Sequence, residues 1–213
     1  MTLDFHAARE NMVENQVRTN DVTDHPVQDA MRVIARERLC PPGKLHLAYA
    51  EAVVEYAPGL FLMQPRDISK LLQAVRPRTG ERALAICAPY AAAVMAEIGL
   101  KVTLRLPEGG TSAVIASAFA GAKVAFETGD IAAMSDGAPY DVIICEGAVT
   151  HTPKTWLDML GEGGRLGVVE RSGPVGRARL YTCGSDGLIA GREIFDATPP
   201  VLAAFREAPA FVF

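Results

Sequence analysis

The sequence lacks the features that mark several easily recognised classes of protein. Its four cysteines form no Cys-x-x-Cys pair and no cluster with histidine, which argues against a zinc or other metal site and against a disulfide framework. No apolar run approaches the roughly 18 to 20 residues of a membrane span. A net charge of −4 leaves no basic footprint for nucleic acid. We therefore expect a cytoplasmic globular protein, with neither nucleic acid nor a membrane among its partners.

Common catalytic and phosphate-binding motifs are missing as well. Without a Gly-x-Ser-x-Gly turn, a hydrolase triad has no evident nucleophile. The glycine-rich run 161–167 follows a predicted helix and precedes a predicted strand, whereas a P-loop needs the reverse order. No glycine lies between Gly80 and Gly99, although this segment reads as a strand, a turn and a helix. A nucleotide cradle of that kind usually has glycines in its turn.

Helical periodicity dominates the first 80 residues. Apolar residues three and four apart, as at Val27, Met31 and Ile34, predict helices within residues 5–38, interrupted by the polar stretch 19–26. A further short helix is expected to begin with Asp67 as its N-cap. We interpret residues 1–80 as a helical and loop appendage packed on an α/β domain of residues 81–213, the two forming one structural unit.

From residue 82, short apolar runs alternate with helical patterns, which predicts a mostly parallel sheet flanked by helices. The expected strands are 83–87, 101–106, 122–128, 140–146 and 164–170. The expected helices are 89–98, 111–119 and 153–160. Strand-like runs on both sides of the Gly-Ser-Asp-Gly stretch 184–187 predict an antiparallel C-terminal hairpin. The fold class is therefore α/β.

An open α/β sheet binds its ligand at the carboxyl ends of its strands. In this chain those ends fall near Cys87–Tyr90, Arg105–Pro107, Gly129–Ile131 and Cys145–Ala148. We expect a ligand crevice at these four places.

Residues spread over nearly the whole chain resemble one family. The N-terminal positions in register are Met12, Val13, Gln16, Val17, Asp24, Val27, Ala30, Met31, Arg36 and Pro41. The similarity continues through 48–65, 138–149, 160–170 and 195–213. Together these stretches resemble the protein-L-isoaspartate O-methyltransferases. The resemblance implies a Rossmann-like class I methyltransferase fold, S-adenosylmethionine as cofactor, and a role in protein repair on proteins or peptides with isoaspartyl residues.

The resemblance also assigns positions to a site. The substrate-side loop would be Phe61, Leu62, Met63, Gln64 and Pro65. The cofactor would lie against Ala88, Tyr90, Arg105, Asp130, Ile131, Glu146 and Gly147. For several of these an ordinary structural role competes: Asp130 as a helix cap, Glu146 as a cap-like or solvated carboxylate, and Tyr90 as a core residue. The catalytic residue stays unassigned.

Three departures from the family pattern fall on this site. Ala85 stands where the family has an acidic residue, and the glycine-rich turn after it is replaced by Cys-Ala-Pro-Tyr. Arg105, which has only donors, stands where an acidic residue would accept from the ribose hydroxyls, unless Glu108 takes that role. The run 61–63 replaces a Thr-Ile-Ser stretch and offers no hydroxyl.

Two interpretations remain open. One is a divergent isoaspartyl methyltransferase, in which catalysis is mostly positioning of the methyl group against a carboxylate that is already a nucleophile. The other is a methyltransferase fold that has lost the cofactor and acts as a binding or regulatory protein, with an exposed apolar loop at 59–63 for a protein partner or a second copy. A weaker third option places a small anionic ligand near Arg105.

Overall fold

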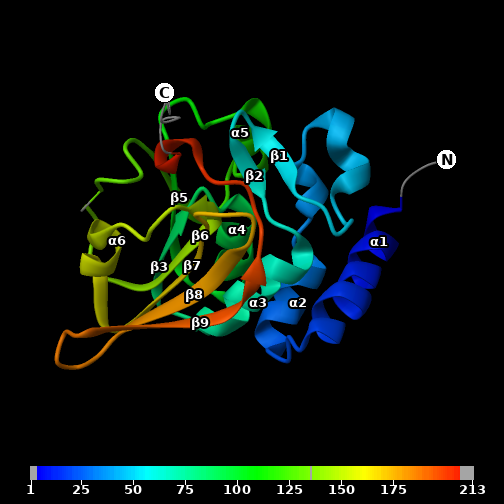
Figure 1. Cartoon of the computed structure of the whole chain (residues 1–213). Helices are drawn as coiled ribbons and strands as arrows, with labels where there is room; N and C mark the ends of the chain where they lie inside the picture. Colours follow the sequence, from blue (N-terminus) through cyan, green and yellow to red (C-terminus); the bar gives the residue numbers. More distant parts are fainter. Residues whose placement is uncertain (1–3, 135, 207–213) are drawn as a thin grey trace.

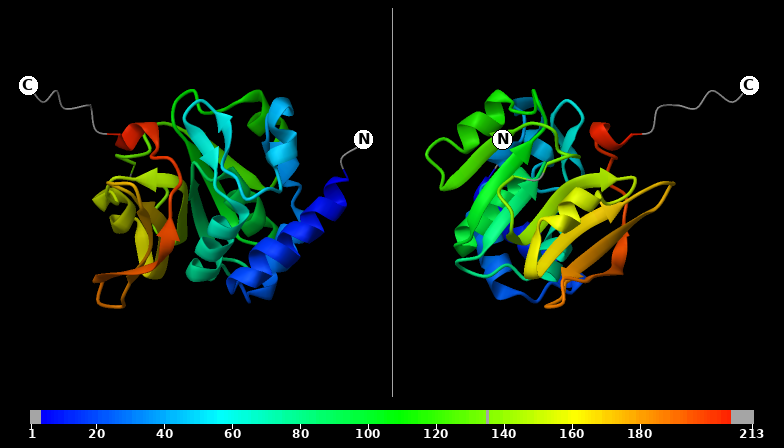
Figure 2. Two further views of the ribbon diagram at one scale, coloured as in Figure 1. Left: turned by 45° about the vertical axis from the view of Figure 1, so that its right-hand side comes forward. Right: turned by 90° about the vertical axis from the view of Figure 1, so that its left-hand side faces the viewer.

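The computed structural model describes residues 4–134 and 136–206 and contains a seven-stranded sheet in the order β5-β4-β3-β6-β7-β8-β9. The first five of these are parallel, and β8 and β9 add antiparallel pairs at one edge. Figure 1 shows the N-terminal helices packed beside the sheet, and Figure 2 shows the turn of the β8–β9 hairpin pointing away from them. The predicted α/β fold class is confirmed.

The N-terminal part is helical but broken, as the polar stretch predicts. Helix α1 covers Phe5–Met12, and a π-helical turn and a 3-10 turn carry the chain on through Val13–Val17 and Arg18–Asn20. Helix α2 covers His25–Val33, and 3-10 turns follow at Arg36–Leu39 and Pro42–Leu47. Each of the two helices begins at an aspartate. Asp4 accepts from the backbone N–H of Ala7, and Asp24 accepts from that of Val27, as N-caps do.

A small hairpin that the sequence did not predict follows these helices. Strands β1 (Val54–Ala57) and β2 (Leu60–Leu62) pair antiparallel. Helix α3 then covers Pro65–Val75, with Gln64 at the N-cap position. The prediction of Asp67 as N-cap is wrong, because Pro65 already occupies the first helical turn. Asp67 instead lies inside the helix, is 4% exposed and pairs with Arg66.

The remaining elements follow the predicted alternation of strands and helices. The strands are β3 (Arg82–Ile86), β4 (Lys101–Leu106), β5 (Val124–Thr128), β6 (Tyr140–Val149), β7 (Leu160–Glu170), β8 (Gly176–Cys183) and β9 (Ile189–Ala197). The helices are α4 (Pro89–Ile98), α5 (Ala113–Ala118) and α6 (Lys154–Asp158). Strands β6 and β7 are longer than predicted. The extra residues of β6 extend its carboxyl end into the expected crevice.

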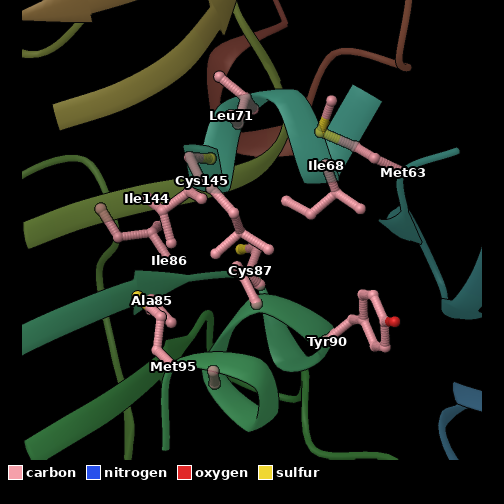
Figure 3. Packing of buried hydrophobic residues seen from close by; sticks show 14 of the residues in the cluster. Met63, Ile68, Leu71, Ala85, Ile86, Cys87, Tyr90, Met95, Ile144 and Cys145 are labelled. Carbon is pink, nitrogen blue, oxygen red and sulfur yellow. The ribbon is translucent and has the colours of Figure 1, made fainter. Parts of the chain in front are cut away.

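One buried cluster runs through the molecule and draws on both sides of residue 80. Helices α3 and α4 contribute side chains to this cluster, and Figure 3 shows Cys87 between the side chains of Ile68 and Tyr90.

The four cysteines are buried and free. In the part of the chain that the structure describes, no helix is long and apolar enough to cross a membrane. The division into an appendage and a domain at residue 80 stays a proposal.

Candidate functional site

The ends of the central strands are tied together, as the crevice prediction requires. The backbone N–H of Cys87 donates to Arg105 O at 2.9 Å, which joins the end of β3 to the end of β4. The N–H of Gly129 donates to Leu106 O at 3.1 Å and joins the end of β5 to the end of β4. Three of the four predicted places therefore meet at one edge of the sheet. The fourth, at the end of β6, is joined to them by a buried carboxylate.

The turn after β3 is completely buried. Cys87, Ala88 and Tyr90 are each 0% exposed. The hydroxyl of Tyr56 donates to Cys87 O at 3.1 Å and covers the turn from the side of β1. Cys87 has φ +51°, a conformation that favours glycine, so the chain makes the sharp turn there without one. Burial raises the pKa of the Cys87 thiol, which favours its protonated form.

Glu146 occupies the centre of the site. Its side chain is 0% exposed, and its Oε1 accepts from the backbone N–H of Ala91 at 3.0 Å in the first turn of α4. Its Oε2 accepts from the N–H of Met63 at 3.0 Å. Burial raises the pKa of the Glu146 carboxyl, while Arg36 and the backbone N–H groups oppose that rise. The expectation of a solvated carboxylate is wrong, and the cap-like interpretation is correct.

Arg36 is 0% exposed and acts on the Glu146 carboxyl through its charge, which opposes the rise of that pKa. Its Nε donates to Ala48 O at 2.8 Å, its Nη2 donates to Met63 O, and its guanidinium carbon lies 4.7 Å from the centre of the Tyr90 ring. Among the described residues, Arg36 Nη1 and the Tyr90 hydroxyl have no hydrogen-bond partner. A lone arginine in a helical pattern carries no sequence signal of burial. Only its position in the family register singled it out.

The predicted substrate loop is pinned to this cluster. Leu62 and Met63 are 0% exposed, Pro65 is buried, and Phe61 and Gln64 are half-buried. The expectation of an exposed apolar loop at 59–63 is wrong. The β1–β2 hairpin turns these side chains inward, and Glu146 and Arg36 hold both polar backbone atoms of Met63.

Arg105 lies at the edge of the site in an ion-pair network. Its Nη1 is 2.9 Å from Glu127 Oε2 and 3.1 Å from Asp136 Oδ2, and its side chain is 12% exposed. Arg105 is therefore held by carboxylates at the end of β4 and is mostly shielded from solvent. A Cβ added at Gly129 would lie 2.9 Å from Arg105 Nη2, so the guanidinium packs against the backbone there. With two carboxylates already beside it, Arg105 offers little net charge to an anion.

Asp130 and Ile131 support the loop after β5. Asp130 Oδ1 accepts from the N–H groups of Ala132 and Ala133 at 2.8 and 3.2 Å, which closes a local turn. The expectation of a helix cap is wrong, because residues 131–133 form bends and no helix. Ile131 is 1% exposed, and its carbonyl accepts from the Trp156 indole at 2.7 Å. A contact of these residues with adenine stays a prediction.

The end of β6 is covered by a C-terminal segment that the sequence did not place. Gly147 has φ +117°, and a Cβ there would lie 2.7 Å from Leu202 Cδ2. The segment forms a parallel bridge, in which Ala148 N–H donates to Pro200 O and Leu202 N–H donates to Ala148 O, each at 2.9 Å. Phe205 then packs edge-on against Trp156, with ring centres 5.5 Å apart.

The structure thus brings Met63, Ala88, Tyr90 and Glu146 into one buried cluster, with Gly147 beside it. Arg105, Asp130 and Ile131 lie on the neighbouring loops and are engaged by other parts of the chain. Within residues 4–134 and 136–206, no group of three or more His, Cys, Asp or Glu side chains could hold a metal ion. Internal hydrogen bonds hold both oxygens of Glu146 as well as Arg36 Nε and Nη2, while Arg36 Nη1 and the Tyr90 hydroxyl have no partner among the described residues.

The sequence pattern of this chain matches that of one known family. The family model described as Protein-L-isoaspartate(D-aspartate) O-methyltransferase (PCMT) matches residues 7–181. A protein-L-isoaspartate O-methyltransferase 1 from Rhodopseudomonas palustris (strain HaA2) is 34% identical over 168 residues, 76% of this chain and 69% of the relative. One from Methylorubrum populi is 32% identical over 179 residues, 82% of this chain and 84% of the relative.

Solved structures agree at the level of the fold. One of them is a Plasmodium falciparum structure described as a protein-L-isoaspartate O-methyltransferase in complex with S-adenosyl-L-homocysteine. Its TM-score is 0.77 at 15% identity, and the match covers 92% of this chain and 98% of the Plasmodium falciparum chain. Another protein-L-isoaspartate O-methyltransferase has a TM-score of 0.73 and 23% identity, and this chain spans 66% of that chain. The match over residues 7–181 and the relatives above 30% identity agree with the resemblance found in the sequence. The chain belongs to the protein-L-isoaspartate O-methyltransferase family.

Proposed function

We propose two functions for this chain, of which its family supports one and its site geometry the other. The family supports methyl transfer from S-adenosylmethionine to the isoaspartyl carboxylates of proteins or peptides. The support is the family match over residues 7–181, together with relatives that are named for this reaction. Proteins that carry isoaspartyl residues are accordingly the first class of partner to test.

The residues that the resemblance assigns to the cofactor do not fit it. A cofactor cradled at a strand–turn–helix needs open space and free backbone N–H groups at the start of the helix. Here the turn Cys87–Tyr90 is buried, and the Glu146 carboxylate already accepts from Ala91 N–H. The ribose acid is replaced by Arg105, which Glu127 and Asp136 hold. No step of a methyl transfer is therefore derived from these residues.

This geometry favours the second function, a protein of this family that binds without S-adenosylmethionine. The single observation that carries it is the buried Glu146, whose two oxygens join α4 to the substrate-side loop. The Glu146 carboxylate accepts from a backbone N–H group at the start of α4. A cofactor bound at this turn would need that N–H group as a hydrogen-bond donor. We infer that the site geometry favours a binding or regulatory role without S-adenosylmethionine, and it leaves the class of partner unassigned.

Calorimetric titration with S-adenosylmethionine and S-adenosyl-L-homocysteine tests this conclusion. We expect no saturable heat at millimolar ligand, whereas the Methylorubrum populi relative serves as the positive control on the same instrument. Micromolar binding by this chain would overturn the conclusion and restore methyl transfer. A second titration uses one peptide with an isoaspartyl residue and its aspartyl twin. Binding of the isoaspartyl peptide alone, without cofactor, would assign the partner class, while equal binding of both would remove it.

A further inference from the structure

A hollow of about 750 Å³ lies away from the closed site, between α3, the turn before α2, and β9. Figure 1 shows α2, α3 and β9 close together in one view. The carbonyl of Arg76, which lines the hollow, accepts from Arg165 Nη2 at 2.7 Å. Arg165 pairs in register with Val142, near the amino end of β6. The hollow is therefore at the opposite end of the parallel strands from the site described above.

The lining of this hollow carries a surplus of two positive charges. Its charged residues are Lys70, Arg76, Arg78, Arg192, Asp21 and Asp24. Asp24 is already engaged as the N-cap of α2, at 3.1 Å from the N–H of Val27. The net charge of the whole chain is −4, so the positive charge of this hollow is opposite in sign to that of the molecule. A concave surface with a surplus of cations attracts anions.

Three of these cations have no partner of their own. Arg76, Arg78 and Arg192 are exposed, and no other residue of the described chain forms an ion pair or hydrogen bond with their guanidinium groups. Arginines elsewhere are held by carboxylates, as Arg165 is by Glu81 at 2.9 Å and Arg179 by Glu170 at 3.0 Å. The fork of donors on each free guanidinium matches the oxygens of a phosphate group.

The walls of the hollow are fixed before any ligand arrives. Gln73 Oε1 accepts from Asp24 N–H at 3.0 Å and from Thr23 N–H at 2.6 Å, while its Nε2 donates to Asp21 O at 2.9 Å. These bonds fasten the turn before α2 to α3. On the other wall, the Lys70 ammonium lies 4.6 Å from the centre of the Phe195 ring. A hollow with fixed walls loses less conformational entropy on binding.

We propose that this hollow binds a small phosphate-bearing molecule with at least two negative charges. The surplus of two cations suits a dianion, the free arginines suit phosphate oxygens, and the volume lies in the range of about 300 to 1,000 Å³ typical of small-molecule sites. Pro77 and Ile194 line the same hollow and offer an apolar surface to an organic group attached to the phosphate. This site is independent of the proposed function, because it shares no residue with the closed cluster.

Titration calorimetry at low salt with pyrophosphate and with ADP tests the proposal. We expect saturable one-to-one binding of both, tighter for ADP if the apolar wall takes part, and weakening as salt rises. The double variant Arg78→Ala/Arg192→Ala should bind at least about tenfold more weakly. The control Lys101→Ala/Lys123→Ala removes the same charge from two exposed residues elsewhere, and should keep the affinity of the unmodified chain.

Three outcomes would overturn the proposal. These are no saturable binding of either ligand, an equal loss in the two double variants, or saturation only by a phosphorylated peptide, which would assign the hollow to a protein partner. Thermal unfolding of both double variants checks that the fold is kept. The single variant Arg192→Glu reverses one charge at an exposed strand position, and its loss of binding should exceed that of Arg192→Ala. Equal binding by these two single variants would also count against the site.

Discussion

The two ends of the parallel strands differ in how their polar groups are satisfied. At the carboxyl end, the Glu146 carboxylate and the Arg36 guanidinium are buried and bonded to the backbone of the same chain. At the other end, the arginines of the basic hollow stand in solvent with no partner in the described chain. The Glu146 oxygens are already satisfied internally and have little to gain from a ligand, whereas the unpaired cations of the hollow have much to gain. Within the closed site, only Arg36 Nη1 and the Tyr90 hydroxyl are buried without a hydrogen-bond partner among the described residues. The end that the fold family uses is therefore the closed one here.

The largest expected effect is on the carboxylate that closes the site. Glu146→Ala leaves the N–H groups of Met63 and Ala91 without acceptors and removes a buried negative charge on which the charge of Arg36 acts. Such a loss costs about 3 to 5 kcal/mol of unfolding free energy. Urea unfolding followed by circular dichroism measures it. The control Glu162→Ala, at an exposed position on β7, should change stability by less than about 0.5 kcal/mol. Similar effects of both variants would mean that Glu146 does not hold the two loops together.

A smaller loss is expected where the C-terminal segment covers β6. Gly147→Ala puts a Cβ 2.7 Å from Leu202 Cδ2 at φ +117°, so overpacking and backbone strain together should cost about 2 to 4 kcal/mol. Leu202→Ala removes the clashing atoms and leaves a cavity of its own. We expect the double variant to be more stable than the sum of the two single effects predicts, by about 1 kcal/mol. Strict additivity in the same unfolding experiment would show that the segment does not lie on Gly147.

The pH dependence of stability separates the buried carboxylate from an exposed network. Burial raises the folded-state pKa of Glu146, so its contribution should be most favourable at low pH and be lost as pH rises above its ordinary value of about 4.3. Glu170 has the opposite sign: despite partial burial, bonds from Thr152, Tyr181 and Arg179 lower its pKa. Its stabilisation is present above about pH 4.3 and is lost as pH falls.

Unfolding free energies of Glu146→Gln and Glu170→Gln, measured from pH 4 to 8 and subtracted from those of the unmodified chain, should therefore slope in opposite directions. The sign of each slope, and not its size, is what the two directions of pKa shift predict. Parallel slopes would mean that the environments of the two carboxyl groups do not differ as the structure describes.

The smallest effect on stability is expected at the open end. Arg78→Ala/Arg192→Ala removes side chains without partners in the described chain, so the unfolding free energy should stay within about 0.5 kcal/mol of the unmodified value. Differential scanning calorimetry without ligand measures it. A loss of more than about 1 kcal/mol would show that these arginines stabilise the fold, which would remove the contrast between the two ends.

Much of the framework was predictable because its signals are local. The strand at 101–106 and the helix at 89–98 were predicted with the bounds that the structure has, since apolar runs and helical periodicity need no knowledge of neighbours. The prediction of Asp67 as an N-cap is wrong, because Pro65, two residues earlier, already starts the helix with its fixed φ. The β1–β2 hairpin was missed because its strands are only four and three residues long. A cytoplasmic location and self-association stay predictions.

The sequence by itself determined the α/β class, the family, and the absence of a glycine turn between Gly80 and Gly99, because each depends on residue identity and order along the chain. Only the tertiary structure decided what fills the missing cradle. Glu146 reaches Met63 across 83 positions and Ala91 across 55, and such long-range contacts leave no periodic trace in a sequence. The basic hollow arises in the same way, because Arg78 and Arg192 lie far apart in the chain and become neighbours only when β9 packs beside α3.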